Sequence, residues 1–347
     1  ALNQLNIGLA LEAGLCISLI AILLDKMSLA WANKQTDYFG NLTFFQRNKN
    51  VLFFGASFVI GIILAYVGTF IFKGSFNYLF EIPHNKGIST ADFWNKGVDW
   101  IFDTFFVYIK AFNTWLIQDV LQPMRALYLR MPAVATLVLA VGAGYLIGGI
   151  RSALVVAGLT LFIALSPWWD RALVTLYMAT FGVVISCLIG FTVGTLCFQN
   201  KKSAAFMLGV CDIFQTFPSF VYLIPVMMLF GITDTSVLIA VIVYATIPAT
   251  RYTIEGLRSV PVGLHEAATM SGVNKFQRLT KIEFPLAFPH MMLGLNQTIV
   301  FALFMVIIGA FIGTEDLGQY ILKALSDKNG AGIGLTLGIC VAFIGLI

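Results

Sequence analysis

The sequence predicts an all-α protein, a polytopic bundle of transmembrane helices. Hydrophobic residues fill 59% of the 347 positions, charged residues fill 11%, and the mean hydropathy is +0.88. Soluble domains contain about 45–50% apolar and about 25% charged residues, so this composition requires lipid as the main solvent. The apolar residues also form long runs, as expected for helices that need about 20 residues to cross a bilayer.

These runs predict about nine spans plus one amphipathic interfacial helix. The spans lie near residues 10–30, 51–72, 132–149, 152–167, 172–198, 204–231, 235–251, 290–313 and 331–347. Little more than Arg151 separates the third span from the fourth, which predicts a tight hairpin or a partly interfacial pair. The run 204–231 is longer than a straight crossing and contains Pro218 and Pro225, so we expect a kink there.

Small residues predict where the spans approach each other closely. Lipid tails are as apolar as leucine, so helices in a membrane associate through close packing at glycine and similar residues. The Gly-x-x-x-Gly pairs are Gly144/Gly148, Gly190/Gly194 and Gly309/Gly313. The five cysteines all lie in apolar runs, where we expect them to be buried as small hydrophobic residues.

The Lys/Arg bias of the short loops orients the bundle. The segment 251–289 is the most basic and is therefore placed in the cytoplasm; it carries Arg251, Arg258, Lys275, Arg278 and Lys281. Alternation of the spans places 31–50 and 199–203 on the same side. It places 73–131, 167–171 and 314–330 outside.

The segment 92–130 repeats aromatic and aliphatic residues at helical spacing, with charged residues between them. Trp94, Trp100 and Trp115 are typical of an amphipathic helix that lies at the level of the lipid headgroups. A soluble helical cap packed on the membrane domain is the alternative.

An internal repeat indicates how the chain is organised. Residues 7–21 and 333–347 both begin with the pattern Ile-Gly-Leu-x-Leu, as if the chain opened with the end of one module and continued with a second copy. We therefore expect residues 1–50 to be the last span and cytoplasmic tail of a preceding copy, or an N-terminal extension. An additional span and the extracytoplasmic amphipathic region occupy 51–131, and the core of the module, with its polar loop at 251–289, occupies 132–347.

The polar loop predicts a helix–turn–helix. Pro261 suits the first turn of a helix because its φ is preset and its missing N–H is not needed there. Gly272 suits the left-handed position after a helix end, and Asn274 can cap a second helix that Pro285 then breaks. A solvated helical hairpin with no partner is the alternative.

Residues for catalysis are scarce. The three histidines and five cysteines do not fall at the spacing of metal ligands or nucleophiles. The phosphate-binding pattern G-x-x-x-x-G-K-[ST] is missing, and the basic residues are too dispersed for a nucleic-acid footprint. We therefore expect no enzyme activity, no catalytic, cofactor-binding or metal-binding residue, and no nucleic-acid partner.

The loop also resembles a known motif. Glu266-Ala267-Ala268, three residues, Gly272, nine residues and then Ile282-Glu283-Phe284-Pro285 is similar to the EAA loop of the ABC importer permeases, with Phe284 in place of a leucine. The flanking stretches 215–232, 294–312 and 316–325 are similar to the glycine betaine/proline betaine permeases. The resemblance covers about 90–347, and residues 1–26 resemble the last helix of the same family.

The resemblance implies a type I ABC importer permease, of the MetI-like class, in the bacterial inner membrane. It implies a coupling helix in which Glu266, Ala267, Ala268, Gly272, Ile282 and Pro285 serve contact with an ATP-binding cassette ATPase dimer. ATP would bind that partner and not this chain. The other implied partners are an extracytoplasmic solute-binding protein and a second permease half, fused in the same full-length chain or supplied by a homodimer. A compatible solute such as glycine betaine or proline betaine would be the substrate.

Polar residues and prolines inside the apolar runs are candidates for the translocation pathway, because such groups usually face a cavity or the interior of the bundle. The candidates are Gln215, Thr216, Pro218, Tyr222, Pro225, Asn296 and Gln297. Hydrogen bonding between helices is the alternative role.

An ion-driven secondary transporter of a small zwitterionic or quaternary ammonium solute is the rival function, because broken helices suit that class. Such a transporter requires acidic residues inside the membrane. We expect almost none in the predicted spans apart from Glu12, and this favours the ATP-driven class.

Overall fold

The computed structural model describes residues 7–32, 49–70, 89–328 and 330–347, and these contain helices and turns but no strand. The helices are α1 (Ile7–Ala32), α3 (Lys49–Phe70), α5 (Ala91–Trp115), the π-helix η3 (Leu116–Leu121), α6 (Gln122–Leu129), α7 (Ala133–Leu165), α8 (Trp169–Phe198), α9 (Lys201–Thr216), α10 (Phe220–Phe230), α11 (Asp234–Arg258), α12 (Val262–Met270), α13 (Lys275–Arg278), the π-helix η4 (Leu279–Glu283), α14 (Phe284–Ile308), the 3₁₀ helix η5 (Gly309–Ile312), α15 (Leu317–Ser326) and α16 (Ala331–Leu346). The predicted all-α class is confirmed.

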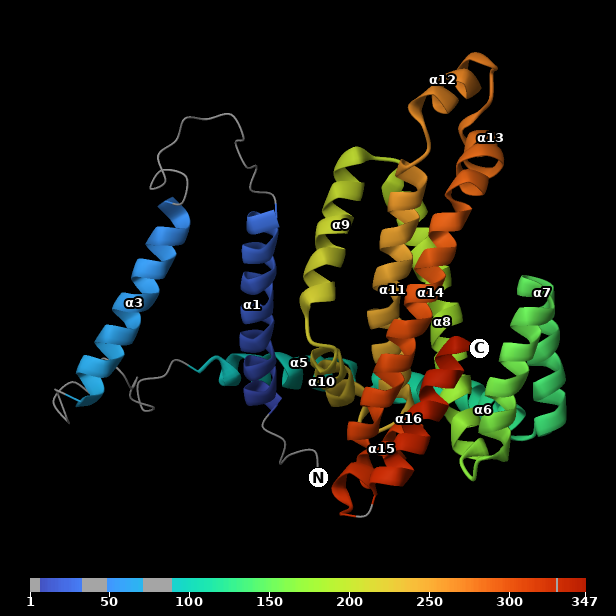
Figure 1. Cartoon of the computed structure of the whole chain (residues 1–347), viewed down its shortest axis with the longest axis horizontal. Helices are drawn as coiled ribbons and strands as arrows, with labels where there is room; N and C mark the ends of the chain where they lie inside the picture. The colour runs from blue at the N-terminus through green and yellow to red at the C-terminus, as the bar shows by residue number, and fades with distance from the viewer. Residues whose placement is uncertain (1–6, 33–48, 71–88, 329) are drawn as a thin grey trace.

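The centre of the bundle is α11, which lies between α8 and α14 (Figure 1). A Cβ built on Gly190 of α8 would lie 2.4 Å from the Cβ of Ala249, and one built on Gly294 of α14 would lie 2.8 Å from the Cβ of Tyr252. No side chain fits at either position, so the backbones of the three helices approach closely, and the predicted packing role of Gly190 and Gly194 is confirmed. Gly313 has a different role, because it adopts a φ of 87° and its Cβ position faces open space.

Each of the nine predicted runs is at least partly helical, but fewer than nine spans are established. Four described helices are long and apolar enough to cross a membrane, and a fifth span results if α9 and α10 count as one. The bounds of α7 enclose two predicted runs that Gly149 separates, α16 and the apolar part of α3 (Leu52–Leu64) are shorter than 18 residues, and α1 is not among the four.

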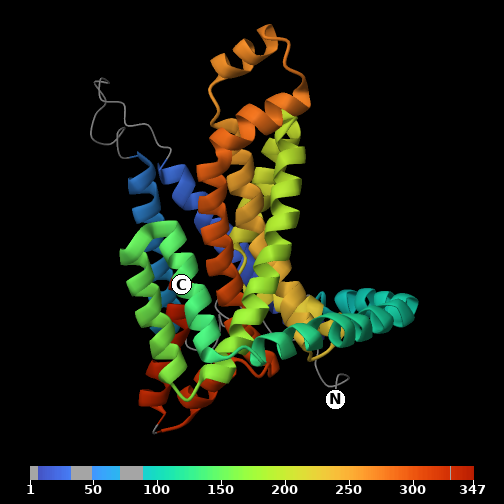
Figure 2. The same cartoon turned by 90° about the vertical axis from the view of Figure 1, so that its right-hand side faces the viewer.

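The pair of runs at 132–149 and 152–167 forms a hairpin, as one of the two alternatives predicted. Gly149 interrupts α7 with φ 69° and ψ −161°, a conformation open to glycine. A Cβ on Gly144 would lie 3.1 Å from Val156, so the two arms pack against each other, and Figure 2 shows the chain reversing between them. Each arm is about 24 Å long at 1.5 Å per residue, shorter than a full crossing.

The run 204–231 is broken more sharply than a kink. Its two helices, α9 and α10, meet at 92°. The break lies at Pro218, where Phe217 adopts an extended conformation because a residue before proline avoids the helical region. The expected kink is therefore a full break at Pro218, and the two helices count as one span only as a broken one.

The amphipathic segment consists of α5, η3 and α6, which run across one end of the bundle (Figure 1). Two interactions fix the segment there. Asn113 donates a hydrogen bond from Nδ2 to the carbonyl of Phe230 at 3.1 Å, and the side chain of Leu116 is buried in the hydrophobic core. At helical spacing, the charged residues of α5 share one face of the helix: Asp92, Lys96, Asp99, Asp103 and Lys110. Exposed aromatic side chains lie on the other faces: Phe93, Trp100, Tyr108 and Trp115. Its position at the membrane interface stays a prediction.

The ends of the bundle agree with the predicted sides. In Figure 1, α12 and α13 lie at one end, and α5, α6 and α15 lie at the other. The predicted division at 50/51 and 131/132 stays a prediction. Gly14 of α1 faces Val221 of α10, and Glu12 accepts a hydrogen bond from Ser89 at 2.8 Å. Helix α1 therefore contacts both the predicted segment 51–131 and the predicted segment 132–347.

Candidate functional site

The polar loop forms the predicted helix–turn–helix at the far end of the bundle. Its first helix, α12, begins at Val262, one residue later than expected, because Pro261 takes the position before the helix. Gly272 adopts a φ of 75°. Asn274 then caps α13 with a reciprocal pair of hydrogen bonds, its Oδ1 accepting from Gln277 N at 2.8 Å and its N–H donating to Gln277 Oε1 at 3.1 Å.

The tip of the loop is exposed and apolar. Glu266 and Ala267 are exposed, whereas Ala268 is buried within the loop, where its carbonyl accepts from Val273 N. Met270 is 90% exposed, and other large apolar side chains around it are exposed too: Val262, Leu264 and Phe276. An exposed apolar surface with polar residues at its edge is typical of a protein contact site.

The second half of the loop differs from the prediction. The helix continues from Lys275 through the π turn η4 into α14, and Figure 2 shows that its direction changes there. Pro285 therefore does not end the helix. It follows the π turn, which already relaxes the backbone bonding, at an early position of α14 where a missing N–H is tolerated.

An ion pair with a buried carboxylate fixes this turn. Arg278 donates from Nε to Glu283 Oε1 at 2.9 Å, and Glu283 is only 2% exposed. Ile282 is half-buried and Pro285 is exposed. Beside the pair lies a cavity of about 500 Å³, bounded by the end of α8 and by the start of the Lys275 helix.

A second polar cluster lies deeper in the bundle, between α9 and α11. Arg251 Nη1 donates to Asp212 Oδ1 at 2.7 Å and to Gln215 Oε1 at 2.9 Å, and its Nε donates to Glu255 Oε1 at 3.0 Å. Arg251 is thus part of α11 and not of the loop, because the helix continues to Arg258. Asp212 corrects a second expectation: it is an acidic residue within the predicted run 204–231.

Five aromatic rings adjoin this cluster at the bend between α9 and α10. Tyr244 of α11 stacks on Phe301 of α14, with ring centroids 4.7 Å apart, and lies 5.3 Å from the ring of Tyr222. Phe214 and Phe217 complete the group. The hydroxyl of Tyr222 donates to the carbonyl of Phe214, the residue next to Gln215.

The structure therefore brings together Gln215 and Tyr222 among the predicted pathway residues. Pro218 forms the bend beside them, and Thr216 only bonds its own helix, donating to Ile213 O at 2.7 Å. Asn296 is exposed and Gln297 half-exposed on α14, and neither forms a hydrogen bond with the described residues. Pro225 lies inside α10.

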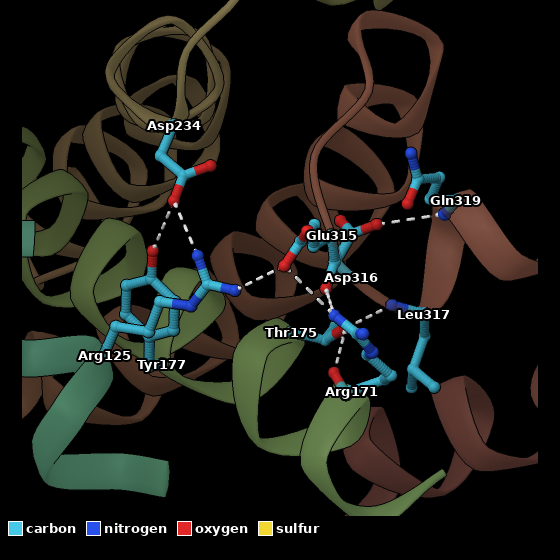
Figure 3. A network of polar contacts seen from close by, with 9 residues as sticks. All are labelled: Arg125, Arg171, Thr175, Tyr177, Asp234, Glu315, Asp316, Leu317 and Gln319. Atoms are coloured by element: carbon cyan, nitrogen blue, oxygen red, sulfur yellow. Dashed lines mark hydrogen bonds and ion pairs between the residues drawn. The ribbon is translucent and has the colours of Figure 1, made fainter. Parts of the chain in front are cut away.

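The opposite end of the bundle holds an ion network that the sequence did not reveal (Figure 3). Glu315 accepts hydrogen bonds from Arg125 of α6 at 2.9 Å and from Arg171 of α8 at 3.2 Å. Arg125 also lies 3.9 Å from Asp234 of α11, which accepts from the hydroxyl of Tyr177 at 3.2 Å. These contacts join three helices to the loop before α15, and the two arginines lower the pKa of Glu315.

Asp316 lies next to this network but is buried. It caps α15 by accepting from Gln319 N at 3.0 Å, and the following N–H, of Leu317, donates to Thr175 Oγ1 at 3.1 Å. Its second carboxylate oxygen has no hydrogen-bond partner among the described residues. Burial raises the pKa of Asp316 to about 7.

Fold and loops together define a polytopic helical membrane protein with an exposed helix–turn–helix at one end. A family model described as "Binding-protein-dependent transport system inner membrane component" matches residues 182–347. The glycine betaine/proline betaine transport system permease protein ProW of Escherichia coli is 31% identical over 268 residues, 76% of this chain and 75% of that protein. The chain belongs to this family of inner membrane transport components.

Two other relatives are more similar. The trimethylamine N-oxide transport system permease protein TmoV of Pelagibacter ubique is 87% identical over all 347 residues, and its namesake in Ruegeria pomeroyi is 38% identical over 360 aligned positions. The chain covers 48% of the first and 52% of the second. It therefore spans about half the length of these relatives.

Proposed function

We propose that the chain is part of the membrane-spanning permease of an ATP-driven importer. The observation that carries this proposal is the polar loop, whose capped α12 exposes Glu266, Ala267 and apolar neighbours at the end predicted to be cytoplasmic. A docking helix needs these properties: fixed geometry, an accessible charge, and apolar area that a partner can bury. Glu266, Ala267 and the turn at Gly272 would contact an ATPase dimer, which binds the ATP, and Ala268, Ile282 and Pro285 would hold the contact surface in shape.

The substrate we propose is a small zwitterion with a methylated, fully substituted nitrogen. The relatives at 87% and 38% identity are named for trimethylamine N-oxide, and the relative at 31% is named for glycine betaine and proline betaine. Trimethylamine N-oxide is therefore our first candidate and the betaines are the second. Both combine a methylated cationic nitrogen with an oxyanion.

The family implies two further partners, an extracytoplasmic solute-binding protein and a second permease half. The chain covers about half of the TmoV relatives, and this agrees with a second half fused in the same full-length protein. A homodimer is the alternative. Neither arrangement changes the position of the docking helix.

An ion-driven transporter remains the second candidate because Asp212 lies within an apolar run and is paired with Arg251. That mechanism accounts for the embedded acid but gives no role to the exposed loop. Ion-driven uptake without ATP would favour it.

Reconstituted proteoliposomes test the proposal. The full-length permease, its ATPase and its binding protein should take up radiolabelled trimethylamine N-oxide only with ATP inside the compartment that holds the ATPase. Glu266→Lys should lower uptake and ATPase retention at least about tenfold, because it reverses a charge at the contact. Asp327→Lys is the matched control at the other end of the bundle and should retain the ATPase. Uptake without ATP, or normal ATPase retention by Glu266→Lys, would contradict the proposal.

A further inference from the structure

The ion cluster around Arg251 lies on α11, one of the four described helices that are long and apolar enough to cross a membrane. Arg251 precedes the end of α11 by seven residues, about 10 Å at 1.5 Å per residue. Its side chain is 32% exposed and that of Asp212 is 46% exposed. Charged side chains inside a membrane span face a water-filled path or the bundle interior. These two are only partly covered by the bundle, so we infer that their open side faces the solute path.

Arg251 also keeps donors for a further group. A guanidinium has five N–H donors, and the hydrogen bonds to Asp212, Gln215 and Glu255 come from Nε and Nη1 alone. Nη2 forms no hydrogen bond with the described residues. An oxyanion that entered from the open side would find a charged donor without breaking the existing contacts.

The aromatic group lies on the same side of α11. Tyr244 and Arg251 are seven residues apart, two helical turns, and therefore share one face of the helix. On α9, Phe214 is next to Gln215, so the aromatic rings and the ion cluster are adjacent there as well. Tyr244, Phe217 and Phe301 are each partly exposed, which leaves ring surface for a ligand.

These two groups have complementary chemistry. Aromatic faces attract quaternary ammonium groups through the ring quadrupole, and Arg251 attracts an oxyanion.

We propose that Arg251 and the rings of Tyr222, Tyr244 and Phe301 form a passage site for a zwitterion, with its methylated nitrogen on the rings and its oxyanion at Arg251 Nη2. The proposal rests on the proposed function, because it assigns to this site the substrate that the permease would carry. It goes further in placing a selective contact inside the membrane, independent of the extracytoplasmic binding protein. A purely structural role, in which Arg251 only joins α9 to α11, predicts no contact with the solute.

Saturation-transfer NMR on the methyl protons of trimethylamine N-oxide separates the two roles. The full-length permease with its ATPase, in nanodiscs and without the binding protein, should transfer saturation to these protons. Tyr244→Leu should weaken binding roughly 3- to 30-fold because it removes a cation–π surface. Arg251→Gln should weaken it roughly 10- to 100-fold because it removes a charged donor. Phe206→Leu, which removes an exposed ring of α9 outside the group, is the matched control and should bind as the wild type does.

Competition identifies the oxyanion contact. Glycine betaine has a carboxylate and tetramethylammonium has none, so glycine betaine should displace trimethylamine N-oxide better from the wild type, and this preference should disappear in Arg251→Gln. If Arg251→Gln does not assemble, Arg251→Lys can replace it. The lysine keeps a positive charge for the ion pair but lacks the planar guanidinium, so it should show a smaller preference for glycine betaine over tetramethylammonium. Tyr244→Phe should retain more binding than Tyr244→Leu.

Two results would overturn the site: wild-type binding in both Tyr244→Leu and Arg251→Gln, or equal displacement by both competitors in the wild type. Neither result affects the proposed function, which depends on ATP-driven uptake by the wild type. If that uptake is missing while the NMR pattern holds, the site stands and the proposed function fails.

Discussion

The two ends of the bundle are built from opposite kinds of contact. At the end predicted to be cytoplasmic, α12 and α13 are held by backbone hydrogen bonds, one reciprocal cap and the single ion pair Arg278–Glu283, and apolar side chains as large as Met270 are left exposed. At the other end, Arg125, Arg171 and Glu315 tie helices α6 and α8 to the loop before α15, and Arg125 also reaches α11. The first end therefore exposes apolar surface that no part of the described chain covers. At the second end, the charged side chains are paired with each other.

This difference indicates which end is completed by a partner. A surface whose polar groups are already paired gains little from a new contact, because each new contact must first break an old one. The loop at the other end has no such cost, and burial of its exposed apolar side chains would stabilise a complex. The outer network instead fixes the relative position of the helix ends around α11.

The largest expected effect concerns the buried Asp316. An acid with a pKa of about 7 in the folded state and of 3.8 in the unfolded state binds an extra proton only when folded, so the free energy of unfolding falls as pH rises from about 4 to 7 and is lowest above 7. Asp316→Asn keeps the cap and removes the buried charge. It should raise the free energy of unfolding at pH 8 by at most about 4 kcal/mol, at 1.36 kcal/mol per pKa unit.

Thermal unfolding followed by circular dichroism, at pH 5 and at pH 8, measures this effect. The stabilisation should fall to about 1.6 kcal/mol at pH 5, where the folded acid is protonated but the unfolded acid is still ionised, and it should vanish only below about pH 4. The exposed Asp327, at the other end of α15, is the control, and Asp327→Asn should show no such pH dependence. A stabilisation of the same size at both pH values would mean that the charge of Asp316 is not the cause.

A smaller effect is expected at the other end, from Gly272→Ala. The Cβ position of Gly272 faces open space, so the cost is the left-handed backbone alone, about 1–2 kcal/mol. A smaller fraction of the molecules would then have this loop in its docking conformation. The affinity for the ATPase should therefore fall roughly 5- to 30-fold. Gly263 also has an open Cβ position but lies in α12 with an ordinary φ. Gly263→Ala should therefore not weaken binding, and equal losses in both variants would show that the turn conformation is unimportant.

The smallest effect is expected from Glu315→Gln. Glu315 is 61% exposed, and exposed ion pairs contribute about 0–1 kcal/mol. The variant should therefore lower the free energy of unfolding by less than about 1 kcal/mol, and by less still in high salt, where the wild-type pairs are screened. Unfolding measured at low and high ionic strength checks this. A loss of several kcal/mol that is independent of salt would mean that the outer network acts as a buried cluster.

Local signals in the sequence predicted the polar loop well. A left-handed turn at Gly272 and a cap at Asn274 each depend on one residue and its near neighbours, and both are present. The short gap between two apolar runs predicted a hairpin there as one of two alternatives, and Gly149, where the chain reverses, was not identified. Pro285 shows the limit of such reasoning, because a π turn placed just before the proline lets the helix continue.

The pairing of distant charges was beyond local patterns. Arg171 and Glu315 are 144 positions apart, and nothing in either segment indicates the other. Asp212 is different, since an acid inside the run 204–231 is visible in the sequence, and its partner Arg251 was hidden only because α11 extends further than its apolar residues do. A charge inside an apolar run was therefore the signal that could have indicated the Arg251 cluster.

The close approach of α8 and α14 to α11 limits how the bundle can change shape. Glycines let α8 and α14 approach α11 so closely that Ala249 and Tyr252 of α11 fill the places where their side chains would lie, and such surfaces cannot slide without losing their fit. The three helices therefore pack as one unit, and the bent pair α9–α10 is joined to this unit by the Arg251–Asp212 ion pair. The bent pair supplies Asp212, Phe214 and Tyr222, so we infer that a displacement of α9–α10 changes the width of the space between these residues and the Tyr244 face of α11. Opening and closing of this space would then be a change in the distance between α9–α10 and α11.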